Sequence, residues 1–255
     1  MKKIHDYIVE HQWRFGGHPF FVRLERPAPL SEILPFPTLL TFWVMGFQDA
    51  LRLNAGMMTE PRFQAMARQH VREDSGHDLW FLRDLELIDG SLPDLRILFG
   101  EEHWAAREMT YGLLSDLILA EDDVERTVVV LAIESVSEIF LERIVPYFQG
   151  AGVERALRYF ATNHSEVEKD HELRDLDTRE MLDAIELSPS AEARCRSAVD
   201  RCYARFEDLF DRIDKKIEEC LAAGGGRYDE RAALVRDAAR ATHRPGREPV
   251  GHPAR

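Results

Sequence analysis

The chain has 255 residues, of which 45% are hydrophobic, a composition that suits one sizeable domain with its own core. Its formal net charge is −13, and so acidic a surface would repel both nucleic acid and anionic membranes. No segment approaches the roughly 20 consecutive apolar residues that cross a bilayer. We therefore expect a cytoplasmic protein whose partner is a small molecule, with no nucleic-acid partner and no membrane.

Helical periodicity runs along the whole chain whereas period-2 alternation is scarce, so the predicted fold class is all-α. Glycine and proline clusters separate the segments, and Asp122 with Asp123 is typical of a helix N-terminus. We expect one helical domain over 1–225 and, over 226–255, a short helix at most with a disordered tail. In chain order, helices are predicted near 2–15, 19–26, 36–54, 60–89, 101–120, 122–149, 152–183 and 190–222.

Three of these predicted helices carry ionisable residues within their apolar stripes, at offsets that return a side chain to nearly the same helix face. Carboxylates at such positions are costly to bury unless cations neutralise them. No lysine shares the stripes, so metal ions are the better candidates. The stripes are Phe63, Ala67, His70, Asp74, His77, Phe81, Leu85 and Ile88; Val124, Thr127, Leu131, Glu134, Glu138, Leu141, Val145 and Phe148; and Val153, Leu157, Phe160, His164, Glu168 and His171.

Two stripes share the spacing His-x3-(Asp/Glu)-x2-His, at 70/74/77 and at 164/168/171. Four imidazoles with three or four carboxylates exceed the usual ligand set of one first-row ion and suit two ions that share bridging carboxylates. The mixed nitrogen and oxygen donors favour iron, with manganese or zinc as weaker candidates. Glu138 is a candidate hydrogen-bond partner for a ligating imidazole. Two alternatives stay open, namely a solvated helix face for 164–171 and a hydrogen-bonded core histidine for His70.

Four segments resemble the haem-oxygenase-like diiron oxidases and oxygenases: "HPFF", "FPTLLTFWVMGFQDALRLN", "HVREDSGHDLWFLRDLELI" and "HSEVEKDH". The resemblance covers residues 15–220, and the superfamily includes metal-free relatives similar to thiaminase II and the pyrroloquinoline-quinone synthase. It implies a haem-oxygenase-like bundle of about seven helices that holds two iron ions and uses O2. The chain departs from the family pattern at Glu168, where Asp is commoner, and at His70, where some members carry Glu. The ligands that the family pattern implies are Asp74, His77, Glu134, His164, Glu168 and His171.

The resemblance further implies an oxidase or oxygenase that acts on a small amino acid, amine or carboxylic acid in a biosynthetic reaction. The outcome would be N-oxygenation, C–C cleavage or desaturation. Three alternatives are a metal-free thiaminase-like or quinone-synthase-like enzyme of the same fold, a two-metal hydrolase, and a non-enzymatic metal store. The oligomeric state is open, and a homodimer is one option. Candidate substrate-pocket residues are Trp43, Phe47, Gln48, Tyr111 and Tyr159.

The chain has three cysteines, an odd number without the Cys-x2-Cys spacing of redox or metal sites. All three follow the apolar stripe of the predicted helix near 190–222. Because free cysteines at such positions pack as small apolar side chains, we expect Cys195, Cys202 and Cys220 to be buried free thiols.

Overall fold

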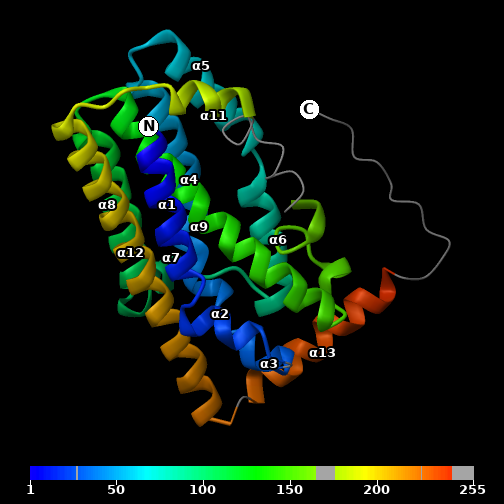
Figure 1. Cartoon of the computed structure of the whole chain (residues 1–255). Coiled ribbons are helices and arrows are strands. Elements are labelled where there is room, and N and C mark those ends of the chain that lie inside the picture. The colour runs from blue at the N-terminus through cyan, green and yellow to red at the C-terminus, as the bar shows by residue number, and fades with distance from the viewer. Residues whose placement is uncertain (27, 165–175, 225, 243–255) are drawn as a thin grey trace.

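The computed structural model describes residues 1–26, 28–164, 176–224 and 226–242, and within them every regular element is a helix (Figure 1). The all-α class is therefore confirmed. None of the helices in the described residues combines the length and the apolar character that a membrane-spanning segment requires. The elements are α1 (Lys2–Phe15), α2 (Pro19–Leu24), α3 (Leu30–Ile33), α4 (Pro37–Met57), α5 (Pro61–Glu73), α6 (His77–Asp89), α7 (Leu95–Leu98), η1 (Glu101–His103), α8 (Trp104–Leu119), α9 (Asp123–Gly150), η2 (Glu154–Ala156), α11 (Leu176–Asp183), α12 (Pro189–Ala222) and α13 (Gly226–Ala241).

Helix starts are set by side chains that satisfy the first free backbone N–H groups. Asp122 caps α9 by accepting from the Glu125 N–H at 2.8 Å, as the sequence predicted. Ser188 does the same for α12, where Pro189 occupies the first helical position and has no N–H to lose.

The long helices α4, α8, α9 and α12 form the body of the bundle, and α1 packs across α9 and α12 (Figure 1). Helix α9 is apolar on nearly all sides because neighbours cover it on most of its surface. Phenylalanine rings from helices far apart in sequence fill the centre, mostly edge to face. The ring of Phe210 contacts those of Phe15, Phe20 and Phe140 at centroid distances of 5.2–6.0 Å. This aromatic core fixes α9 and α12 against the N-terminal helices.

Two predicted helices differ from the structure. The segment predicted as one helix over 60–89 is broken at 74–76, where Gly76 adopts φ +97° and separates α5 from α6. A Cβ at Gly76 would meet nothing within 4 Å, so glycine is needed there for its backbone conformation alone. The helix predicted from 152 begins instead with the one-turn η2, followed by an extended Leu157.

The C-terminal helix α13 is longer than the short helix expected after residue 225. It spans 16 residues and buries Ala232, Val235 and Ala239 against α3, α6 and η2. Small side chains suffice here because they let the helix lie close to its neighbours. Cys195 and Cys202 are buried free thiols as predicted, and Cys220 is only partly buried.

Candidate metal centre

The corner between α5 and α6 places three of the predicted ligands together. His70 lies in the last turn of α5, Asp74 is the residue that ends it, and His77 opens α6. All three side chains are buried. His77 Nδ1 lies 3.1 Å from Asp74 Oδ1. The turn at Gly76, rather than a continuous helical stripe, brings Asp74 and His77 to the same side.

Helix α9 contributes Glu134 from the opposite side. Its Oε1 lies 3.1 Å from His70 Nε2, and both side chains are buried. Glu134 sits in the middle of α9, which neighbouring helices cover on most of its surface, so its carboxylate is buried with the apolar side chains around it. A buried carboxylate beside an imidazole is stabilised by a proton on that imidazole or by a shared cation.

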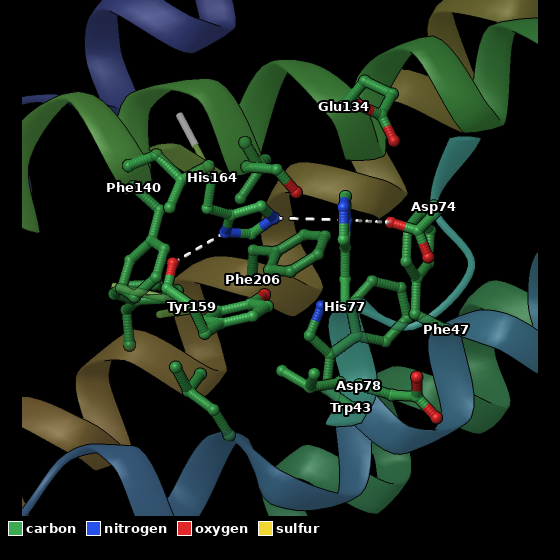
Figure 2. Close-up of a pocket in the computed structure, with 16 residues that line it drawn as sticks. Trp43, Phe47, Asp74, His77, Asp78, Glu134, Phe140, Tyr159, His164 and Phe206 are labelled. Atoms are coloured by element: carbon green, nitrogen blue, oxygen red, sulfur yellow. Dashed lines mark hydrogen bonds and ion pairs between the residues drawn. The ribbon is translucent and has the colours of Figure 1, made fainter. Parts of the chain in front are cut away.

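His164 is the fifth member of this group, and its contact with Tyr159 fixes its tautomer. Its Nδ1 lies 2.6 Å from the backbone carbonyl oxygen of Tyr159, and its Nε2 lies 3.2 Å from His77 Nδ1. Because a carbonyl oxygen can only accept, Nδ1 of His164 carries the hydrogen, and the lone pair of the neutral ring is on Nε2. Figure 2 shows Tyr159, His164, His77 and Asp74 in a row across the site. The nitrogen that faces the other donors is therefore the one able to bind a cation.

Asp84 holds the segment that presents Tyr159 and His164. It lies two turns after His77 on α6, is fully buried, and accepts from the backbone N–H groups of Arg158, Tyr159 and Phe160 at 2.8–3.1 Å. Burial raises the pKa of Asp84 from its ordinary value to about 6, although the three N–H donors act in the opposite direction. One carboxyl group thus ties residues 158–160 to the helix that begins with His77.

A small cavity lies beside these donors and is lined mainly by apolar and aromatic side chains (Figure 2). Its volume is about 50 Å³, room for about three or four waters or a compact ligand group. Among the described residues that line it there is no lysine or arginine. The lining residues are Leu40, Trp43, Val44, Phe47, Asp74, His77, Asp78, Glu134, Val136, Ser137, Phe140, Leu141, Tyr159, His164, Phe206 and Phe210.

Of the five predicted pocket residues, Trp43, Phe47 and Tyr159 line this cavity, and two lie elsewhere. Gln48 is buried behind Asp74, and its amide donates to the Asp74 carboxylate and, at 2.9 Å, to the Asp74 backbone carbonyl. Tyr111 is half exposed on the outer face of α8.

The remaining predicted residues belong to two groups. Glu138 lies one turn after Glu134 and accepts from Gln12 of α1 at 2.7 Å, so it is held toward α1. Glu168 and His171 lie outside the described residues, and the structure says nothing of them.

The types of donor atom in this group suit a cation site, whereas their positions are not those of a formed site. Asp74 and His77, His77 and His164, and His70 and Glu134 lie in pairs at 3.1–3.2 Å. Asp74, His77, Glu134 and His164 line the cavity, and none of its described lining residues is a lysine or an arginine. Within the part of the chain that the structure describes, no group of three or more His, Cys, Asp or Glu side chains is arranged to hold one metal ion.

Asp84 is a functional candidate that the sequence reasoning missed. Its signal was its position seven residues after His77, which places both on one face of α6.

No protein-family model matches the chain, and no curated protein matches it either.

Proposed function

We propose that this chain is a haem-oxygenase-like, non-haem diiron oxidase or oxygenase that uses O2 to oxidise a small organic substrate. One observation carries the proposal: Asp74, His77, Glu134 and His164 come from three separate parts of the chain and line one aromatic cavity, and buried His70 contacts Glu134 at 3.1 Å. A set of inward-facing acids and imidazoles in a core is expensive unless cations occupy it. The mixed carboxylate and imidazole donors favour iron over magnesium or calcium.

Bound iron would supply the reduction of O2, which side chains of these types do not perform by themselves. The contribution of the chain is to orient the donors. The carbonyl of Tyr159 keeps the hydrogen of His164 on Nδ1, so that Nε2 faces the site. The amide of Gln48 donates to Oδ2 of Asp74, which leaves Oδ1 facing His77. These contacts fix the orientation of His164 and Asp74 before any ligand arrives.

The cavity lining favours a substrate with an apolar body. Trp43, Phe47, Phe140 and Phe206 surround the space next to the donors and limit the access of water. A substrate carboxylate would find no lysine or arginine among the described lining residues, so only the metal ions could neutralise its charge. Within the substrate classes that the resemblance implies, an amine with an apolar body fits this lining best.

The proposal is tested by anaerobic titration of the protein with Fe(II) and counting of bound iron, followed by rapid mixing with O2 under optical detection. We expect about two irons per chain and a transient absorbance that appears only with O2. Glu134→Gln should lower the iron count, because it removes a buried anionic donor. Glu142→Gln is the matched control, since Glu142 is exposed on the same helix two turns away.

Three results would redirect the assignment. Wild-type protein that binds no iron at adequate Fe(II) would favour the metal-free members of the same fold. Two bound metals with anaerobic turnover of an ester or amide would favour a two-metal hydrolase. Bound iron that O2 does not oxidise would favour a metal store.

A further inference from the structure

The outer face of α8 carries large apolar side chains where a solvated helix normally carries charges. Trp104, Tyr111 and Ile118 lie on this face at intervals of seven residues and are 58%, 52% and 52% exposed. Leu119 beside them is 74% exposed. Helix α8 is described in full, and Glu108 is the only charged residue among its exposed positions. An isolated exposed leucine is ordinary, but a line of such residues along one helix calls for a partner.

The apolar surface continues onto the segment before α8. Phe99 is 59% exposed, and the ring of Phe42 contacts both Phe99 and Tyr111 at centroid distances of 5.6 Å. The guanidinium of Arg107 lies over Phe99 and Trp104 at 5.6 and 5.7 Å. Arg107 is itself buried and donates to the backbone carbonyls of residues 98 and 100, so its charge is directed inward. We call Phe99, Trp104, Tyr111, Ile118 and Leu119 the α8 patch.

The area of the α8 patch matches what a stable protein interface needs. At about 200 Å² for a large side chain, the exposed fractions leave roughly 600 Å² of apolar side-chain surface. A standard interface buries about 800 Å² on each partner, of which about 450–520 Å² is apolar. The largest apolar patch on an ordinary monomer is about 300–600 Å². Five side chains therefore supply the apolar part of a full interface.

The spacing of the stripe suits a second copy of the same chain. Because Trp104 and Ile118 are each seven residues from Tyr111, a two-fold axis at Tyr111 would place Trp104 of one copy against Ile118 of the other, twice. Antiparallel helices related in this way pair the two Tyr111 rings at the axis. The net charge of −13 makes two copies repel over most of their surface, whereas Glu108 is the single exposed acidic residue of α8. From these features we infer that the chain forms a homodimer through the α8 patch.

The first test is the mass of the protein in solution. Light scattering after gel filtration, at about 1–100 µM chain, should give twice the 29.4 kDa mass of one chain for the wild type. Tyr111→Glu places two like charges at the axis and should give the mass of one chain with an unchanged helical circular-dichroism spectrum. Trp13→Glu is the control, because Trp13 is 80% exposed on α1 and lies outside the α8 patch, and it should leave the dimer intact.

The second test locates the axis. Tyr111→Cys should form a disulfide-linked dimer under mild oxidation because each Cys faces its own copy, whereas Trp13→Cys should not. A wild type of single-chain mass throughout the concentration range would overturn the inference. So would a Tyr111→Glu protein that stays dimeric, because the interface would then lie elsewhere. None of the α8 patch residues lines the metal-site cavity, so these results stand apart from the iron experiments.

Discussion

Replacing Asp84 with alanine removes the acceptor for three backbone N–H groups, those of residues 158–160. An unsatisfied buried N–H costs about 1–3 kcal/mol, so the loss of all three acceptor contacts destabilises the fold by about 3–9 kcal/mol while the carboxyl is protonated. When the buried carboxyl ionises, the free energy of unfolding of the wild type falls. Less stabilisation then remains to be lost on substitution. The pKa of Asp84 is raised from an ordinary 3.8 to about 6, a difference that corresponds to about 3 kcal/mol.

The direction of the pH effect follows from this raised pKa. The stabilisation by Asp84 is fully present below pH 4, where the carboxyl is protonated in the folded and unfolded states alike. It is lost progressively as the pH rises through about 6. We therefore expect Asp84→Ala to destabilise the protein by about 2 kcal/mol more at pH 4.5 than at pH 7.5.

Urea unfolding followed by circular dichroism, at both pH values and with unchanged m-values, measures this difference. Asp84→Asn serves as the matched variant. Its amide oxygen can take the place of Oδ2, which accepts from all three N–H groups, and its amide does not titrate. It should be less destabilised than the alanine variant at pH 4.5. An alanine variant within about 1 kcal/mol of wild type at pH 4.5 would refute the anchoring role, and a larger loss at pH 7.5 would refute the raised pKa.

Three further outcomes are expected. Gly76→Ala should destabilise the fold by about 1–2 kcal/mol in urea titrations through backbone strain alone, since φ is +97° and no atom lies near the new Cβ; a neutral result would mean that this turn relaxes. In native protein, a thiol reagent should modify the partly buried Cys220 well before Cys195, because burial raises the pKa of Cys195 to about 11; equal rates would contradict this order. Burial alone would raise the pKa of Asp123, but the backbone N–H groups and hydroxyl of residues 59–60 and the nearby Arg126 hold it below its ordinary value. Its stabilisation should therefore be present above about pH 4 and lost as the pH falls further, so Asp123→Ala should narrow its gap to wild type in acid unfolding curves.

The helical class and most of the buried positions could be predicted from the sequence, because apolar periodicity records which side of a segment avoids water. Val153, Phe160 and His164 are all buried, as their stripe required, although residues 153–161 do not form the helix from which that stripe was inferred. Apolar spacing predicted burial correctly there and backbone conformation wrongly. The local signals for a break were Gly152, which adopts φ +73°, and the charges that follow it.

From the sequence alone one could predict that acids and imidazoles interrupt three apolar stripes, and hence that a polar group is buried in a helical core. How these side chains meet depends on the packing of the folded chain. The turn at Gly76 rotates His77 toward Asp74, Asp84 ties down a segment 74 positions away, and Tyr159 fixes the tautomer of His164. Asp84 and residues 158–160 are distant in sequence, whereas the other two contacts depend on the local backbone conformation. None of the three leaves a periodic pattern in the sequence, because each is set only when α6 and α9 pack around the same cavity.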